Sequence, residues 1–426
     1  MRCASYQEVL DAIYRSYMAT KPSLKGKHDR QVRRPERIVS IASRLGLIPP
    51  PQKIIRVTGS KGKGSTARLI AAYLQATAGQ TVGLLVSPEE LEHTDRMRIN
   101  GNPISQAEMT GLFNELSDVL DVEERALPAG EYLSPSGLFL LLSLLWFRRR
   151  DVGYFVLEGG RGVLYDEVGQ IPSAVSVVTS ILLEHADYLG PTLADIARDK
   201  LAIGANSARL VIPESVAKAS EEHAVALRGD EIIVPRSGGL NAGPSPMPRW
   251  LLEDARLAAA ATSAFLDCSI DALTTPDLSN VSAAFGTGSV GSTRYAFEAI
   301  VNLDSLDQDM FARWRNQYED LLVIASLPDD KDRDRLLAFF TERDCRIVDV
   351  ALEGTRGYLD YALARRSSHD LVVCDYRDPV AFETKFIRPL QADGPDFVYF
   401  AGTHTFIRLV KLALRQLDGR QSLQNR

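Results

Sequence analysis

The sequence predicts an α/β protein: a P-loop in a doubly wound, mostly parallel sheet, followed by a smaller α/β domain at the C-terminal end. A glycine-rich run follows a short apolar strand at residues 54–58. Short apolar runs then alternate with helical stretches, as in parallel sheets that are covered on both faces. The same alternation starts again beyond residue 290, which predicts a second domain.

The N-terminal segment predicts helices, because its apolar residues recur at helical spacing in Ser5–Met18 and again in Pro35–Gly46. A proline-rich stretch, Ile48–Gln52, leads into the strand before the glycine-rich run. Four more apolar runs predict strands of the same sheet: Thr81–Ser87, Tyr154–Glu158, Ala174–Ile181 and Ala208–Pro213. Helical stretches between them include Ser136–Arg149 and Leu193–Ile203.

Two glycine-rich segments divide the rest of the chain. Ser237–Pro248 is predicted to be a connector before an alanine-rich helix at Leu252–Leu266. Phe285–Thr293 is predicted to be a second connector and the domain boundary, giving domains 1–290 and 291–426. Five apolar runs predict the strands of the second domain: FEAIVNL, DLLVIASL, RIVDVAL, DLVVCDY and DFVYFAGT.

Composition narrows the function classes. The chain has 426 residues, 45% of them hydrophobic, and a formal net charge of −6, which predicts a globular protein with ample core and no nucleic-acid partner. The basic stretch Lys25–Arg34 contains Asp29. It is interpreted as a solvated loop, with contact to an anionic substrate as the alternative.

The four cysteines are scattered without a CxxC pair, which favours neither a zinc site nor a disulfide framework. A reducing cytoplasm is the expected location. The N-terminus lacks the apolar core of a signal peptide, and the longest apolar run, Leu138–Phe147, is too short to cross a bilayer. We therefore expect no membrane segment. A monomer is the default expectation.

The glycine-rich run predicts a site for a nucleoside triphosphate. Its eight residues are Gly59, Ser60, Lys61, Gly62, Lys63, Gly64, Ser65 and Thr66. Glycines let backbone N–H groups approach phosphates, the lysine adds positive charge, and the hydroxyls offer ligands for magnesium. Only two residues separate Gly59 from Gly62, whereas the common P-loop pattern has four. A surface turn rich in glycine and lysine is the alternative.

Polar residues at three strand ends predict a site on the same edge of the sheet. Ser87 and Glu158 end strands, and His185 follows another; together they could hold magnesium near the phosphates. Each also has a structural alternative, as a turn residue, a surface carboxylate or a loop histidine. Lys200 lies near the apolar face of a predicted helix, where a lysine usually extends to solvent; a modified or paired amine is the functional alternative.

Four motifs together resemble the Mur ligase superfamily, and in order and spacing they are most similar to folylpolyglutamate synthase/dihydrofolate synthase. They are GSKGKGST, SPEELEHTDRMRING, FVLEGGRG and TSILLEHADYLGPTLADIARDKLAI. The short P-loop is the form of that superfamily. The resemblance implies the Mur ligase central domain, then a Rossmann-like C-terminal domain. It also implies an enzyme that uses ATP to convert a carboxylate into an acyl phosphate, which an amino acid such as glutamate attacks to form an amide.

The resemblance also implies roles for individual residues. The P-loop residues would hold ATP, with Lys63 neutralising charge, and Ser65, Ser87, Glu158 and His185 would bind Mg²⁺, for which two sites are expected. Lys200 falls where the family has a carbamoylated lysine that binds the second metal. Glu158, His185 and Lys200 join Lys63 as the expected catalytic residues. Asp254, Arg294 and Asp304 are the candidates for contacts to the nucleotide.

Departures from the folate enzymes leave the acceptor open. Glu89 stands where they have histidine, and GGRGVLYDEV stands where they have the glycine-rich motif GLGGRLDATN. The EGGRG turn is similar to cyanophycin synthetase, and FVYFAGTHTFIRLV to the poly-γ-glutamate synthase ligase. A polymerising ligase, or a nucleotide-binding regulatory protein that has lost catalysis, are therefore the alternatives to a folylpolyglutamate-synthase-like ligase acting on a carboxylate acceptor and an amino acid.

Overall fold

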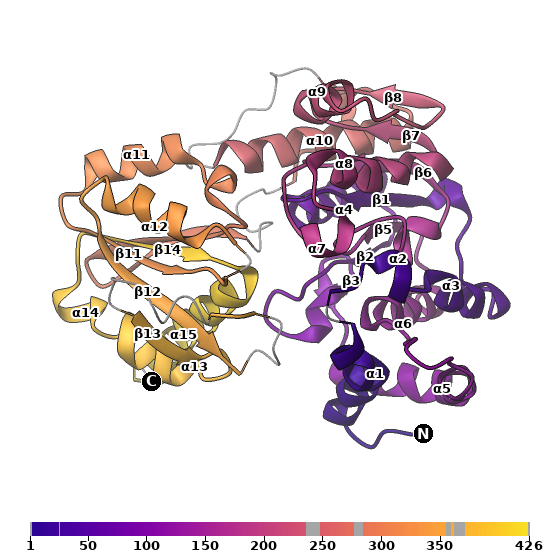
Figure 1. Cartoon of the computed structure of the whole chain (residues 1–426), viewed down its shortest axis with the longest axis horizontal. Coiled ribbons are helices and arrows are strands. Elements are labelled where there is room, and N and C mark those ends of the chain that lie inside the picture. Colours follow the sequence, from indigo (N-terminus) through magenta and orange to yellow (C-terminus); the bar gives the residue numbers. More distant parts are fainter. Residues whose placement is uncertain are drawn as a thin grey trace. The chain divides into compact units, whose positions relative to one another are not determined.

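The computed structural model places the chain in two compact units, residues 1–281 and 282–426. It describes residues 2–24, 26–235, 248–276, 284–329, 331–354, 359–361 and 371–424, with side chains described as far as residue 417. Each unit contains one sheet covered by helices (Figure 1). The predicted connector at Ser237–Pro248 lies, but for Pro248, outside the described residues.

The first unit begins with helices that the sequence signals locally. Ser5 caps helix α1 (Tyr6–Thr20) by accepting a hydrogen bond from the Glu8 backbone N–H, as N-cap serines commonly do. The short α2 (Asp29–Val32) follows, and a proline opens α3 (Pro35–Arg44). Both long predicted helices are therefore confirmed. The interpretation of the basic stretch as a solvated loop, however, is wrong, because Asp29 and Arg33 are buried.

The first sheet has, in the described part of the chain, the strand order β4-β3-β2-β5-β1-β6-β7-β8. Its central strands are parallel, while β3 and β4 form an antiparallel edge. The strands are β1 (Ile54–Thr58), β2 (Val82–Leu85), β3 (Met97–Ile99), β4 (Asn102–Pro103), β5 (Tyr154–Glu158), β6 (Ser173–Val178), β7 (Ser207–Val211) and β8 (Glu231–Ile233). The predicted doubly wound, mostly parallel sheet is confirmed.

Helices cover both faces of this sheet. On one face α4 (Lys63–Ala78) packs beside α10 (Arg249–Leu266), and α10 crosses β6 and β7. On the other, α6 (Pro135–Arg149) packs against β2 and β3, and α1 and α5 (Gln106–Arg125) gather around it (Figure 1). The remaining helices of the unit are α7 (Ala186–Leu189), α8 (Leu193–Leu201) and α9 (Glu214–Glu222).

A buried arginine on β1 binds two segments of the first unit. Arg56 lies on β1 and is fully buried, and burial lowers its pKa to about 9. Its guanidinium donates to the carbonyls of Gly169 at 2.9 Å and Ile203 at 2.7 Å, and to the Asn206 side chain at 2.6 Å. These bonds compensate for the water that the charge loses on burial. They hold the segments that follow β5 and α8.

The second unit has the strand order β13-β12-β11-β14-β10-β9, with β9 antiparallel and the other pairs parallel in its described part. Its strands are β9 (Phe285–Val290), β10 (Thr293–Ala299), β11 (Leu321–Ser326), β12 (Arg346–Glu353), β13 (Leu371–Asp375) and β14 (Phe397–Gly402). Its helices are α11 (Gln308–Gln317), α12 (Arg333–Thr341), α13 (Pro379–Phe382), α14 (Leu390–Asp393) and α15 (His404–Gln424).

One predicted connector is wrong. The glycine-rich segment Phe285–Thr293 forms most of a β-hairpin, with β9 paired to β10. Gly286 and Gly288 lie opposite Phe297 and Tyr295, and a Cβ on either would approach those rings within 2.4 Å. The glycines therefore make room for aromatic rings on the neighbouring strand and do not mark a linker.

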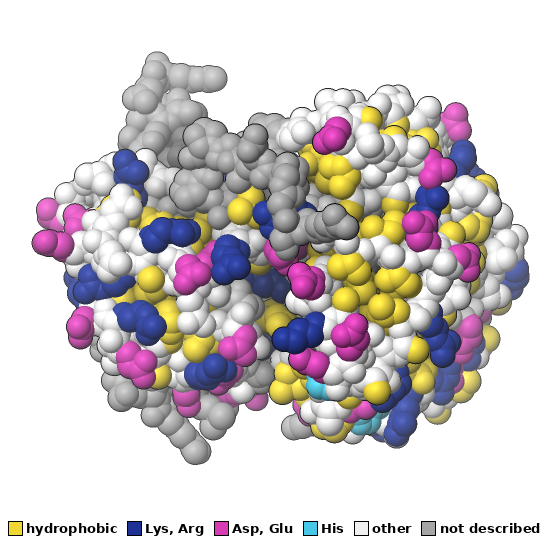
Figure 2. All heavy atoms as spheres, turned by 90° about the horizontal axis from the view of Figure 1, so that it is seen from above, with side chains coloured by type: hydrophobic (Ala, Val, Ile, Leu, Met, Phe, Trp, Pro, Cys, Tyr) yellow, Lys and Arg dark blue, Asp and Glu magenta, His cyan; other side chains and the backbone are white. Residues whose placement is uncertain are grey.

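Acidic and basic side chains intermingle on the described surface seen in Figure 2. No helix in the described residues is long and apolar enough to cross a membrane.

Candidate active site at the P-loop edge of the first sheet

The glycine-rich run forms a tight loop between β1 and α4. Gly59 and Gly62 have φ values of +140° and +89°, which favour glycine. A Cβ would lie 2.0 Å from Thr179 Oγ1 at the first position and 2.2 Å from Asp254 Oδ1 at the second. The backbone N–H of Lys61 also donates to Ser180 Oγ at 2.8 Å. The shortened spacing thus packs the loop against the segment after β6 and against α10.

The P-loop lysine folds back onto its own loop. Lys63 Nζ donates to the carbonyl oxygens of Gly59 at 2.8 Å and Ser60 at 3.2 Å. Lys63 is also the first residue of α4, a 16-residue helix whose N-terminus faces the loop. Helix N-termini favour anions. Backbone N–H groups and a positive charge are therefore placed together, as binding of a polyphosphate requires.

Ser87 and Glu158 meet on one side of the P-loop. The Ser87 backbone N–H donates to Glu158 Oε2 at 2.9 Å, and that oxygen lies 3.4 Å from the position a Cβ on Gly64 would take. Burial raises the pKa of Glu158 to about 7, although Lys63 acts in the opposite direction. No lysine or arginine in the described part of the chain forms a salt bridge with this carboxylate. A divalent cation would compensate its charge.

His185 and Lys200 lie on the other side of the loop. Lys200 is fully buried, and its Nζ donates to the Gly59 and Arg161 carbonyls, each at 3.0 Å. It also pairs with Glu184 Oε1 at 3.1 Å, while His185 Nε2 lies 3.8 Å from Glu184 Oε2. Burial lowers the Lys200 pKa, and Glu184 partly opposes that shift. The solvent-facing alternative for Lys200 is therefore wrong.

The expected magnesium ligands thus form two pairs, one on each side of the P-loop. Among the residues that the structure describes, no three His, Cys, Asp or Glu side chains are grouped closely enough to hold a metal ion by themselves. A lysine ammonium has no lone pair for a metal. Phosphate oxygens between the pairs, and an oxygen-bearing modification of Lys200, would complete the sites.

The three expected nucleotide contacts fall in different places. Asp254 is buried on α10 against Gly62, and burial raises its pKa well above the ordinary value, opposed by Lys61 and Thr66. Arg294 and Asp304 belong to the second unit, where Arg294 is exposed on β10 and Asp304 pairs with Arg335 at 3.2 Å. Asp254 is thereby placed beside the P-loop. Contact with nucleotide stays a prediction for all three.

The sequence did not single out several residues that hold this site. Glu184 directly precedes His185 inside a quoted motif, so its position was the available signal. Asp199 precedes Lys200 and accepts hydrogen bonds from the backbone N–H groups of Val163 at 2.7 Å and Leu164 at 3.3 Å. Both are acidic residues directly before a predicted ligand, and that adjacency is the pattern they share.

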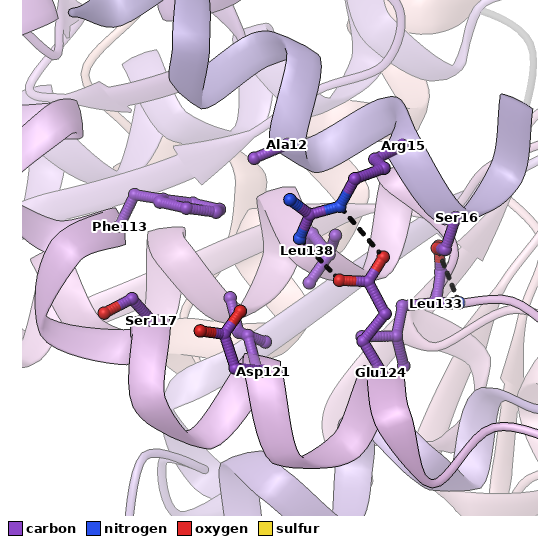
Figure 3. Close-up of a pocket in the computed structure, with 10 residues that line it drawn as sticks. Ala12, Arg15, Ser16, Phe113, Ser117, Asp121, Glu124, Leu133 and Leu138 are labelled. Atoms are coloured by element: carbon purple, nitrogen blue, oxygen red, sulfur yellow. Dashed lines mark hydrogen bonds and ion pairs between the residues drawn. The ribbon is translucent and has the colours of Figure 1, made fainter. Parts of the chain in front are cut away.

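The described part of the first unit also contains two small cavities. The one in Figure 3 lies between α1, α5 and α6, where Arg15 Nε and a terminal guanidinium nitrogen donate to Glu124 at 3.2 and 2.5 Å. Its volume is about 10 Å³, room for one water. An equally small cavity touches Ser87 and Glu158, with Arg96, Ser136 and Asp166 among its other lining residues. Only this second cavity adjoins the P-loop site.

Comparisons with known proteins agree with this geometry. Residues 57–226 match the Mur ligase middle domain. The dihydrofolate synthase/folylpolyglutamate synthase of Escherichia coli is 31% identical over 198 residues, 45% of this chain and 45% of that enzyme. The match therefore spans less than half the length of this curated relative. It confirms the resemblance stated from the four motifs.

Solved structures extend the similarity to both units. The folylpolyglutamate synthase/dihydrofolate synthase of Yersinia pestis, complexed with AMPPNP and Mn, has a TM-score of 0.67 and 26% identity over 89% of this chain and 93% of that one. The apo folylpolyglutamate synthase of L. casei has a TM-score of 0.71 at 20% identity, covering 96% of this chain and 99% of that one. At 20% identity, the similarity to the L. casei enzyme shows a shared fold.

Proposed function

We propose that this chain, which carries a Mur ligase middle domain at residues 57–226, is an ATP-dependent, ADP-forming ligase. It activates a carboxylate as an acyl phosphate and joins it to the amino group of glutamate or a related amino acid. One observation carries the proposal: β1, which leads into the P-loop, lies between β5, which ends at Glu158, and β6, after which Glu184 and His185 follow. The Escherichia coli relative, named for two folate ligase activities, supports it.

The reaction needs charge to be neutralised more than it needs a side-chain nucleophile. An acceptor carboxylate oxygen attacks the γ-phosphorus and ADP leaves; the amine then attacks the acyl carbon, phosphate leaves, and a proton is lost as the amide forms. Both partners of the first step are anionic, so positioning and electrostatics dominate the barrier. Lys63 leaves its own loop carbonyls and turns to the phosphates, and the α4 N-terminus binds them.

Two magnesium sites complete the proposal, and bound Mg²⁺ supplies charge neutralisation between the phosphates and the protein. Ser65, Ser87 and Glu158 would hold one ion, and His185 and Lys200 the other. The Yersinia pestis structure, which is complexed with AMPPNP and a Mn ion, supports a nucleotide with a divalent metal. The lone carboxylate of Glu158 beside the P-loop fits such an ion.

Lys200 would bind its ion as a carbamate. The Lys200 ammonium first loses a proton to give the neutral amine. That amine attacks carbon dioxide, a C–N bond forms, and a second proton leaves the nitrogen, which gives a carboxylate-like ligand. Complete burial beside Glu184 and two backbone carbonyls supports a fixed, functional lysine.

We take a single chain in the cytoplasm as the working unit, with Arg294 and Asp304 of the second unit as further nucleotide contacts.

A screen of ADP release tests this function. Purified chain with ATP, Mg²⁺, bicarbonate, glutamate and a panel of carboxylic acids should release ADP only when an acceptor is present, and more slowly without bicarbonate. Lys63→Ala and Glu158→Ala should lower the rate at least about 100-fold, as loss of a transition-state charge contact does. Lys218→Ala, at a lysine whose side chain is 73% exposed on α9, is the matched control. ADP release that ignores the acceptor, or its absence with every acceptor, would refute the proposal.

A further inference from the structure

Two residues of α2 and its C-terminal end bind the loop that follows Glu158. Asp29 is the first residue of α2, and Arg33 is the extended residue that directly follows the helix. Asp29 pairs with both nitrogens of one edge of the Arg161 guanidinium, Nε at 2.9 Å, and Arg33 pairs with Glu167 at 2.8 Å and Asp166 at 3.5 Å. We call Asp29 and Arg33 the α2 clamp, because they hold the two ends of the 159–167 loop.

The pairs of Arg33 are shielded from water, whereas the Asp29–Arg161 pair joins a buried carboxylate to a guanidinium side chain that is 29% exposed. Asp29 is 2% exposed and Arg33 8%, and Asp166 and Glu167 are buried as well. Breaking a buried ion pair leaves an uncompensated charge, so such pairs hold their geometry more firmly than surface pairs. Ser134 Oγ also donates to Glu167 Oε1 at 2.5 Å, and the Gly160 backbone N–H donates to Asp166 Oδ2 at 3.2 Å. The loop is therefore fixed at both ends.

The middle of the same loop binds to α8 at the position of Lys200. Asp199 accepts hydrogen bonds from the Val163 and Leu164 backbone N–H groups, and Lys200 Nζ donates to the Arg161 carbonyl. Arg161 thus uses its side chain for α2 and its backbone for Lys200. Its guanidinium also lies 3.7 Å from the centre of the Tyr188 ring on α7. A chain of direct contacts runs from Asp29 through Arg161 to the Lys200 amine.

We propose that the α2 clamp is a positioning element that fixes the 159–167 loop and, through the Arg161 carbonyl, the Lys200 amine. Neither clamp residue touches substrate in this proposal. The buried charge pairs restrict the loop, and the loop places a carbonyl oxygen and the wall of the small cavity beside Glu158. The catalytic consequence rests on the proposed ligase function, whereas the placement of Lys200 does not.

Chemical labelling tests the placement without turnover. In the wild-type chain the buried Lys200 should react slowly with an amine-acylating reagent, followed by peptide mass spectrometry. Asp29→Asn should speed its labelling about 10-fold, because local opening becomes easier. The charge-swapped pair Asp29→Arg with Arg161→Asp should restore protection. Arg198→Ala, which removes an exposed charge from α8, should label as wild type does.

Kinetics test the consequence for the reaction. With a working acceptor, Asp29→Asn should lower kcat about 10- to 100-fold, the scale expected when a catalytic group is displaced, and leave the KM for ATP unchanged. If the chain forms no ADP with any acceptor, the ligase proposal fails while the labelling result still decides the positioning role.

A milder variant covers the case in which Asp29→Asn does not fold. Tyr188→Leu removes the ring beside Arg161 at a residue that is 38% exposed, and it should speed Lys200 labelling about 3-fold while the circular dichroism spectrum stays native. Folded Asp29→Asn or Tyr188→Leu protein with wild-type labelling of Lys200, or a swapped pair no better protected than Asp29→Asn, would overturn the proposal.

Discussion

Glu158 is the residue whose burial bears most directly on the proposed chemistry. Its carboxylate is buried against the P-loop, and burial raises its pKa to about 7. A carboxyl that ionises only near neutrality is poorly stabilised by the protein around it. A metal ion with bound phosphates would supply the missing positive charge.

The raised pKa of Glu158 predicts that the stability of the chain depends on pH. The folded pKa of about 7 lies above the ordinary value of 4.5, so between these values the folded chain keeps a proton that the unfolded chain has lost. Stability from this group is therefore present below pH 4.5 and is lost as pH rises to about 7, a total of about 3 kcal/mol. Glu158→Gln should remove that loss, as urea unfolding at pH 5 and pH 8 without Mg²⁺ would measure.

Asp166 has a raised pKa as well, but it is common to both proteins and cancels in the comparison. Glu222→Gln, at an exposed residue of α9, is the control and should follow the wild type. Equal pH dependence of Glu158→Gln and wild type would show that the buried carboxylate has no such shift.

Residues within local motifs could be predicted, and residues that pair across the fold could not. Ser87, Glu158, His185 and Lys200 stand in recognisable runs. In the structure Glu158 and Lys200 contact the P-loop, Ser87 binds Glu158, and His185 lies 3.8 Å from the Glu184 that pairs with Lys200. The pairing of Arg33 with Glu167 joins residues 134 positions apart. Such pairs depend on which surfaces the fold brings together, and one sequence carries no local sign of that.

At the scale of elements, the P-loop is held by its neighbours as much as by its glycines. Its backbone bonds to Ser180, and Gly62 lies against Asp254 on α10. The short spacing leaves no free residue to absorb a change. The loop, the segment after β6 and the start of α10 therefore form one rigid element, as preorganised phosphate binding requires.

Gly62→Ala tests that rigidity. A methyl group would lie 2.2 Å from Asp254 Oδ1, at a φ of +89°, so we expect a loss of about 1–3 kcal/mol of stability and of measurable ATP binding. Gly111→Ala is the matched control, because this exposed glycine of α5 has open space around it and should gain up to about 1 kcal/mol. Urea unfolding and calorimetric titration measure both; ATP binding that survives Gly62→Ala would contradict a rigid loop.

Elements with clear periodicity could be predicted, and short or glycine-rich ones could not. The five predicted strands of the second unit are all present, although β10 (Thr293–Ala299) begins before the predicted run 297–303 and shares only residues 297–299 with it. The hairpin strand β9 was taken for a linker because glycine is typical of connectors. Its glycines are explained only by the aromatic rings on β10, which lie opposite them in the folded sheet.

For the whole molecule, the alternation of strands and helices was sufficient to predict two α/β units with mostly parallel sheets. The carboxyl ends of parallel strands meet at one edge, so the same pattern predicted where the first unit gathers its polar groups. The acceptor could not be predicted, because under the proposed function it would contact loops such as residues 159–167, which are held by residues of α2 and α8.

The central claim is that the γ-phosphate of ATP is transferred to the acceptor carboxylate before the amide forms. The most direct measurement uses an acceptor found in the screen, with ¹⁸O in its carboxylate, and follows the label by mass spectrometry. An acyl phosphate intermediate transfers one ¹⁸O atom to inorganic phosphate for each amide formed. Phosphate without ¹⁸O, released while amide forms, would contradict the account.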